Sequence, residues 1–205
     1  MKINYPEEIS NDLIAKIQQG LRNNNLVVFP SDTVLGLFSR ASKKALGRLN
    51  KFKNRTSEKN YSLIGSNIKN IERFISIDEN NLGVIKKNTP GYFTFVIKPD
   101  SIKNDDILNI LSSDRTLGFR IPKSKLMRMI VNELDFPIIA TSANLSGLPA
   151  IYNLSELKQQ VGEKINNIGL IVEFTKTTKI ASSTVVDLTK NPPQILREGS
   201  GKLII

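Results

Sequence analysis

The chain contains no cysteine and no histidine. Without cysteine it has no disulfides, thiol nucleophile, iron–sulfur cluster or thiolate zinc site. Without histidine it lacks imidazole bases, Ser-His-Asp triads and histidine-ligated metals. The sequence also holds neither a G-x-x-x-x-G-K-S/T phosphate loop nor a G-x-G-x-x-G motif. Any catalysis must therefore use Lys, Arg, carboxylate, hydroxyl or amide side chains, backbone groups, or a metal held by oxygen ligands.

Long apolar runs are also missing. The first ten residues carry acids and no apolar core, which is unlike a signal peptide. Runs such as residues 168–172 are far too short to span a bilayer. We therefore expect a cytoplasmic protein with no membrane segment.

The composition is that of an ordinary globular protein. Of the 205 residues, 40% are hydrophobic and 23% are charged, which favours a single domain over residues 1–205. The chain has 29 basic against 19 acidic side chains, a formal net charge of +10. This excess favours anionic partners such as nucleotides, RNA or phosphates. Nucleotide bias in the genome, which can make a chain rich in Lys and Asn, explains the positive charge equally well.

Short apolar runs alternate with amphipathic stretches, which predicts an α/β fold with a mixed sheet flanked by helices. Helices are expected over residues 7–19, 43–52, 68–74, 80–87, 124–134 and 155–161. Strands are expected over residues 26–29, 34–38, 62–65, 93–98, 117–121, 137–140, 168–174, 184–188 and 194–197. Gly20 is expected to end the first helix, and Asp78 to cap the helix that starts at residue 80.

Polar segments follow several of the apolar runs, where α/β folds build their sites. Residues 30–33 offer two hydroxyls and one carboxylate, although turn formation alone explains these residue types. Residues 118–122 hold an arginine in mid-strand, which also suits a solvent-exposed edge strand. Residues 140–147 are small hydroxyl and amide residues that would let a ligand approach the backbone, or they form a plain loop.

A further polar segment carries Lys53 and Arg55, with Lys59 following. In extended backbone, residues two apart lie on one face, and two such cations would clamp a phosphate. The alternative is that they complement a helix dipole. With Ser183 and Arg197 late in the chain, these segments indicate an anion site made of hydroxyls and guanidiniums.

Motifs spanning residues 29–199 resemble, in order, those of the YrdC-like family. Residues 29–37 are similar to its Tyr-Pro-Thr-Asp-Thr-x-Tyr-Gly-Leu, and 53–55 to its Lys-x-Arg. Further matches, which include Gly-x-Arg-x-Pro and Ser-Ala-Asn-x-Ser-Gly, lie at residues 90–94, 118–122, 141–147, 183–187 and 196–199. The chain departs from the pattern at Leu35, Thr56 and Asn60, and the family's Asp-Gly-Gly stretch is replaced by residues 173–176.

The resemblance implies a twisted mixed sheet with a basic concave surface, and a threonylcarbamoyl-adenylate synthase of the short type. Such an enzyme combines L-threonine, bicarbonate and ATP into threonylcarbamoyl-AMP and pyrophosphate, with Mg²⁺ on the phosphate oxygens. The product serves threonylcarbamoyladenosine synthesis at position 37 of tRNAs that read ANN codons. A tRNA threonylcarbamoyl transferase complex would consume it, and direct tRNA binding is a further implied property.

The resemblance also implies the site residues, position by position. Lys53 and Arg55 take the catalytic role. The implied ATP ligands are Arg55, Lys59, Thr116, Ser142, Asn144 and Arg197. The implied L-threonine ligands are Thr33, Arg120, Thr141 and Ser183. No protein ligand for a metal is implied.

Three other functions compete with the synthase. A non-enzymatic double-stranded RNA or tRNA-binding module is one, although only 6% of residues are aromatic and none is Trp, so stacking surfaces are scarce. A hydrogenase-maturation relative is another, but the acylphosphatase and cysteine-rich zinc regions of such proteins are absent. The third is a paralogue with weak or no synthase activity, against which the intact Lys-x-Arg and Ser-Ala-Asn segments count.

Overall fold

The computed structural model describes the chain except for residues 1, 4–8, 56–60, 100–110, 113–114 and 175–178. Its main sheet contains β2 (Leu26–Pro30), β3 (Leu35–Arg40), β4 (Ser62–Ile64), β5 (Phe93–Ile97), β6 (Leu117–Arg120), β7 (Ile138–Ser142), β8 (Ile168–Ile171), β10 (Thr184–Asp187) and β11 (Gln194–Arg197). A separate small sheet pairs β1 (Lys2–Ile3) with β9 (Glu173–Phe174). The helices are α1 (Asn11–Arg22), α2 (Lys43–Lys53), α3 (Ile68–Ile71), α4 (Glu79–Asn88), α6 (Lys125–Asn132), α7 (Leu154–Val161) and the 3₁₀ helix η1 (Gly162–Asn167).

Strands of the main sheet follow the order β11-β10-β5-β6-β4-β7-β3-β2-β8. The pairs β2–β8, β4–β6 and β5–β10 are parallel, and the other neighbours are antiparallel. The predicted mixed α/β sheet is therefore confirmed. None of the described helices has the length and apolar character needed to cross a membrane.

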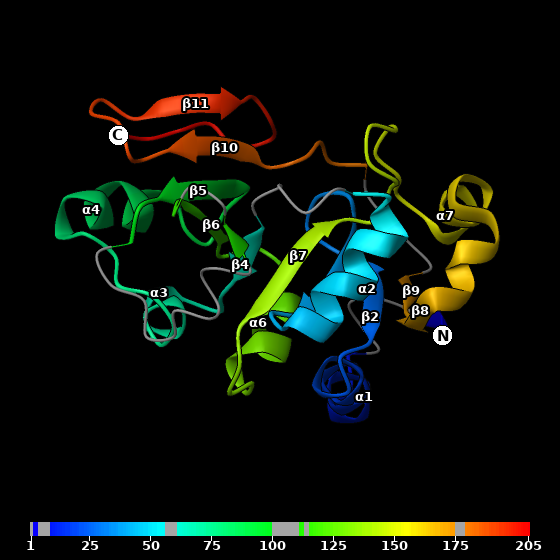
Figure 1. Cartoon of the computed structure of the whole chain (residues 1–205). Coiled ribbons are helices and arrows are strands. Elements are labelled where there is room, and N and C mark those ends of the chain that lie inside the picture. Colours follow the sequence, from blue (N-terminus) through cyan, green and yellow to red (C-terminus); the bar gives the residue numbers. More distant parts are fainter. Residues whose placement is uncertain (1, 4–8, 56–60, 100–110, 113–114, 175–178) are drawn as a thin grey trace.

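Two hydrophobic layers cover opposite faces of this sheet. In β2, Leu26 and Val28 join the layer on one face, whereas Val27 and Phe29 join the layer on the other. This alternation follows from the two-residue period of a strand, and it explains why all the residues of β2 are buried. Helices α1 and α6 pack together on one face, and α2 lies across the other (Figure 1).

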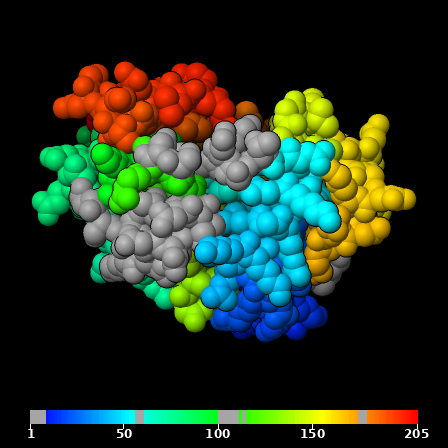
Figure 2. All heavy atoms as spheres, viewed as in Figure 1, coloured from blue at the N-terminus to red at the C-terminus, as the bar shows by residue number. Residues whose placement is uncertain are grey.

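The C-terminal strands lie at one end of the molecule. In Figure 2 the orange and red residues form a ridge along the upper left, and Figure 1 shows β10 and β11 there beside β5. Because β10 is parallel to β5, the segment that precedes β10 enters from the same end of the sheet as the segment before β5. This placement brings the polar residues before β10 beside the start of β5, where the Ser183 hydroxyl lies 2.8 Å from that of Thr94.

Several sequence-based boundaries were wrong. Helix α1 runs through Gly20 to Arg22, and a Cβ at Gly20 would lie 3.2 Å from Val27 Cγ2, so this glycine permits close packing and does not end the helix. Helix α3 stops at Ile71 and does not reach residue 74. The single strand expected over 168–174 is two strands, because the chain changes partner from β2 to β1.

The predicted cap is confirmed, since the Asp78 side chain accepts from Asn80 N.

Helix α2, which ends at Lys53, is fixed at its start by Ser42. The Ser42 hydroxyl oxygen accepts from Ala45 N at 3.2 Å, and the hydroxyl donates to Asn24 Oδ1 at 2.6 Å. We expect Ser42→Ala to lower the free energy of unfolding by about 1 kcal/mol, measured by urea denaturation, because one N-terminal amide of the helix loses its acceptor. The control is Ser155→Ala at an exposed position inside α7, which should leave stability unchanged. Equal losses in both variants would contradict the capping role.

Candidate active site

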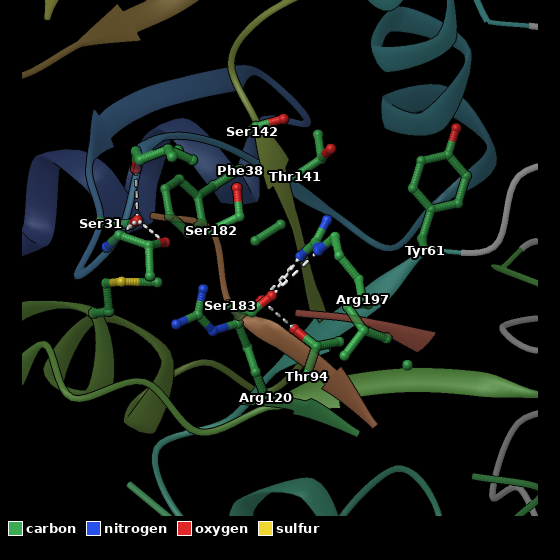
Figure 3. Close-up of a pocket in the computed structure, with 18 of the residues that line it drawn as sticks. Ser31, Phe38, Tyr61, Thr94, Arg120, Thr141, Ser142, Ser182, Ser183 and Arg197 are labelled. Carbon is green, nitrogen blue, oxygen red and sulfur yellow. Dashed lines mark hydrogen bonds between the residues drawn. The ribbon is translucent and has the colours of Figure 1, made fainter. Parts of the chain in front are cut away.

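A cavity of about 350 Å³ lies where the turn after β2, the ends of β6 and β7, and the segment before β10 meet. Its apolar wall includes Phe38 and Met127. Its polar lining residues are Ser31, Thr33, Arg55, Tyr61, Ser62, Thr94, Arg120, Thr141, Ser142, Ser182, Ser183 and Arg197. Figure 3 shows Arg120, Arg197, Thr94 and Ser183 near its centre. The lining is therefore made of hydroxyls and guanidiniums, as the polar segments indicated.

A buried ion pair lies beside this cavity. Arg120 Nη2 donates to Asp32 Oδ1 at 2.8 Å, and the two side chains are only 10% and 5% exposed. Lys123 N donates to the second carboxylate oxygen at 2.7 Å. Burial lowers the pKa of Arg120, and the charge of Asp32 opposes this shift. Arg120 Nε is also buried and has no hydrogen-bond acceptor among the described residues, so it is an unsatisfied donor in the wall of the cavity.

A second guanidinium reaches the cavity from β11. Arg197 Nη2 and Nε donate to the Ser183 carbonyl at 2.8 and 3.2 Å, and the hydroxyls of Ser183 and Thr94 are 2.8 Å apart. Desolvation lowers the pKa of Arg197, and the positive charge of Arg120 lowers it further. Because the two guanidiniums repel each other, an anionic ligand between them would be stabilised.

Arg55 lies at another side of the cavity. Its Nε donates to Ser146 Oγ at 3.0 Å and its Nη2 to Thr141 Oγ1 at 3.3 Å, while its guanidinium carbon lies 5.8 Å from the centre of the Tyr61 ring. The Tyr61 hydroxyl donates to Asn50 Oδ1. Burial raises the pKa of Tyr61, and the charge of Arg55 opposes the shift. Arg55 is thus held in place by the hydroxyl of Thr141 at the end of β7 and by that of Ser146 in the loop that follows.

The expected geometry of Lys53 and Arg55 was wrong. Lys53 is the last residue of α2, and Asn54 has left-handed backbone angles, so the segment is not extended and the two side chains do not share a strand face. Lys53 is 1% exposed, and its Nζ donates to the Ser142 carbonyl at 2.6 Å. It is not among the residues that line the cavity. In this structure Lys53 holds the end of β7 at Ser142.

Other predicted ligands fall into three groups. The cavity brings together Thr33, Arg55, Arg120, Thr141, Ser142, Ser183 and Arg197. Asn144 and Thr116 are not among its lining residues: Asn144 Nδ2 donates to the carbonyls of Leu145 and Leu148, and Thr116 directly precedes β6. Lys59, with Thr56 and Asn60, lies outside the described residues. The ligand roles of all these residues remain predictions.

Sequence reasoning did not assign a role to Asp32, although its carboxylate was noted in the turn at residues 30–33. Asp32 pairs with Arg120 across 88 residues of sequence, and no local pattern signals such a contact. Thr94, Tyr61 and Ser182 were missed as well. The described ranges contain no group of three or more residues of metal-ligand type.

The sequence profile of the Sua5/YciO/YrdC family, described as telomere recombination, matches residues 19–199. Threonylcarbamoyl-AMP synthase of Wigglesworthia glossinidia brevipalpis is 30% identical over 156 residues, which cover 74% of this chain and 79% of the relative. The uncharacterized protein YciO of Escherichia coli K12 is 24% identical over 203 residues, which cover 96% of this chain and 94% of YciO.

Solved structures share the fold. Sua5 of Pyrococcus abyssi in complex with L-threonine matches with a TM-score of 0.82 and 27% identity, over 97% of this chain but 57% of the Pyrococcus protein. The crystal structure of Escherichia coli YciO matches with a TM-score of 0.80 and 23% identity, over 98% of this chain and 95% of YciO. On the profile match over residues 19–199 and this shared fold, the chain belongs to the Sua5/YciO/YrdC family.

Proposed function

We propose that the chain is a threonylcarbamoyl-AMP synthase, which makes threonylcarbamoyl-AMP and pyrophosphate from L-threonine, bicarbonate and ATP. The observation that carries this proposal is the buried Arg120, which has an unpaired Nε and lies in a cavity lined with hydroxyls. Two further findings support it. Relatives that are 25–30% identical are named threonylcarbamoyl-AMP synthase or putative threonylcarbamoyl-AMP synthase, and Sua5, at 27% identity, was crystallised with L-threonine.

L-Threonine would be bound around Arg120. Asp32 holds one edge of the guanidinium at 2.8 Å and leaves the Nε donor for the carboxylate of the amino acid. A charge-assisted contact in a buried site is both strong and directional. Thr33, Thr141 and Ser183 supply hydroxyls on the surrounding walls for the rest of the amino acid.

ATP would lie against Arg55, Ser142 and Arg197. Arg55 supplies a fixed cation for the triphosphate, and Lys59 and Thr116 stay proposed ligands by their motif positions. Mg²⁺ would be held mainly by phosphate oxygens. Lys53 and Asn144 act indirectly, because they bind the carbonyls of Ser142, Leu145 and Leu148 and so shape the end of β7 and the loop after it, where the nucleotide would lie.

The chemistry needs two bond-forming steps. The uncharged amine of threonine attacks the carbon of bicarbonate, and a carbamate forms as water leaves. A carbamate oxygen then attacks the α-phosphorus of ATP in line, and pyrophosphate departs with the bonding electrons. Positioning and electrostatic stabilisation supply most of the rate in phosphoryl chemistry of this type. Fixed guanidiniums and hydroxyls are therefore sufficient, and no imidazole or thiol is required.

The product would be used for threonylcarbamoyladenosine at position 37 of tRNAs that read ANN codons, by a transferase complex in the cytoplasm. The net charge of +10 supports an encounter with tRNA at low ionic strength.

The direct test is pyrophosphate release from ATP with Mg²⁺, run with and without L-threonine and bicarbonate. We expect release only when both are present, with threonylcarbamoyl-AMP identified by mass spectrometry. Substitution of D-threonine serves as the control for a stereospecific site. Pyrophosphate formation that ignores threonine, or none at all, would rule out the synthase.

A family member without synthase activity is the second candidate. The chain is similar over 96% of its length to YciO of Escherichia coli, a relative whose name states no activity. If the chain acts instead as an RNA-binding module, it should bind tRNA with an affinity that falls steeply with salt, and it should release no pyrophosphate.

A further inference from the structure

The turn between β2 and β3 contains a hydroxyl that makes three hydrogen bonds. Ser31 Oγ lies 2.6 Å from the Val34 carbonyl oxygen, 3.0 Å from Thr33 N and 3.1 Å from Thr33 Oγ1. Figure 3 shows Ser31 at one end of the cavity with these bonds dashed. Ser31 has no role in the ligand set derived from the family motifs.

The direction of each bond follows from the single proton of a serine hydroxyl. A carbonyl oxygen can only accept, so Ser31 must donate its proton to Val34 O. The amide Thr33 N–H can only donate, so Ser31 Oγ accepts there. Ser31 therefore has no proton left for Thr33 Oγ1, and the Thr33 hydroxyl must be the donor in their shared bond.

This assignment fixes what Thr33 offers to the cavity. Its only hydroxyl proton points at Ser31, so its lone pairs face other neighbours. Thr33 is 5% exposed and lines the cavity, and no donor to its Oγ1 occurs among the residues that the structure describes. The Thr33 oxygen is thus an acceptor that lacks a donor from the protein, at a site where a ligand would reach it.

We propose that Ser31 is a positioning residue, which fixes the Thr33 hydroxyl as an acceptor for an N–H or O–H donor of the amino-acid substrate. The inference rests on the proposed function, because that function makes L-threonine the ligand. Threonine carries two donor groups, the amine and the side-chain hydroxyl. Either group can donate a hydrogen bond to the Thr33 oxygen.

The opposite polarity occurs at Thr141. Arg55 Nη2 donates to Thr141 Oγ1, so the Thr141 proton stays available for an acceptor on the ligand. Arg120 Nε offers another proton. The cavity therefore accepts at Thr33 and donates at Thr141 and Arg120. A zwitterionic amino acid fits this arrangement in one orientation, with its carboxylate toward Arg120 and a donor toward Thr33.

The test uses four proteins: the wild type, Ser31→Ala, Thr33→Val and the double variant. Steady-state pyrophosphate release gives KM for threonine and for ATP, and titration calorimetry gives threonine affinity without turnover. We expect Ser31→Ala to raise KM for threonine about three- to tenfold, the value of one oriented hydrogen bond, and to leave KM for ATP within twofold. Ser31→Thr keeps the hydroxyl and should restore the wild-type KM.

The double variant separates positioning from general damage. If Ser31 acts through Thr33, then Ser31→Ala causes no further rise in the threonine KM once Thr33 is valine. The analogue 2-aminobutyrate, which lacks the side-chain hydroxyl of threonine, identifies the donor. If Thr33 accepts from that hydroxyl, Thr33→Val should lose the preference for threonine over 2-aminobutyrate. If Thr33 accepts from the amine, Thr33→Val should keep that preference. Both results support the proposal.

Additive effects in the double variant, or an unchanged threonine KM in Ser31→Ala, would overturn the proposal. A wild-type protein that binds threonine but releases no pyrophosphate would overturn the synthase assignment alone. The threonine affinities of the four proteins, measured by calorimetry, would still decide the role of Ser31. A wild-type protein that binds no threonine would overturn both.

Discussion

Arg120→Ala should nearly abolish threonine-dependent pyrophosphate release and should also destabilise the fold. Without the guanidinium, the Asp32 carboxylate is left buried and lacks its cationic partner. Breaking a buried pair in this way lowers the free energy of unfolding by about 3–5 kcal/mol. Loss of the proposed carboxylate contact should lower kcat/KM for threonine by roughly two to three orders of magnitude. Chemical denaturation and initial-rate kinetics measure the two effects.

Two further variants separate these effects. Arg120→Lys keeps a positive charge beside Asp32 but has no Nε–H, so it should recover part of the stability while threonine KM stays high. The matched control is Arg22→Ala, which breaks the exposed pair with Asp135 at 3.8 Å and should change stability by less than about 1 kcal/mol without affecting turnover. Full activity in Arg120→Lys would show that Nε does not bind the substrate.

Arg55→Ala should lower kcat about 30- to 1000-fold, which corresponds to about 2–4 kcal/mol of transition-state stabilisation from one preorganised charged donor. Arg55 is held by Ser146 and Thr141 before any ligand binds, so its removal takes away a fixed cation and not a mobile one. KM for ATP should rise as well. Threonine affinity, measured by calorimetry without ATP, should fall by no more than about threefold, because Arg55 holds Thr141 and its loss weakens at most the one neutral hydrogen bond between Thr141 and the substrate.

The control for Arg55 is Lys51→Ala. Lys51 lies in the last turn of α2 and is exposed, so this variant removes one positive charge nearby without touching the cavity. We expect wild-type kcat in Lys51→Ala. If both variants slowed turnover equally, general electrostatics would explain the loss and Arg55 would have no specific role at the phosphates.

Local patterns in the sequence predicted the positions of several elements closely. The strand at 194–197 was predicted with its observed bounds, and the helix expected over 43–52 extends by one residue to Lys53. That single residue mattered, because the predicted phosphate clamp of Lys53 and Arg55 required extended backbone from Lys53 onward. Backbone conformation at a helix end depends on residues such as Asn54, whose left-handed angles replace the extended backbone that was expected there.

For the site, the sequence predicted residue types better than partners. Hydroxyls and guanidiniums were expected at one anion site, and the cavity contains Thr33, Arg120 and Arg197. The pairing of Asp32 with Arg120 and the burial of Lys53 could not be predicted, because both depend on how distant strands are aligned in the sheet. The register of β3 with β7 is what places Ser142 near the N-terminal half of the chain.

Three of the contacts that shape the cavity join residues far apart along the chain. Arg120 with Asp32, Lys53 with Ser142, and Thr94 with Ser183 are separated by 88, 89 and 89 residues. Closing loops of this size is entropically unfavourable until much of the sheet has formed, and topologies of this kind fold slowly. During synthesis the cavity therefore lacks the lining residues Ser182, Ser183 and Arg197 until β10 and β11 have left the ribosome. Ligand affinity should consequently appear in one step with the completed fold, and truncated chains should bind nothing.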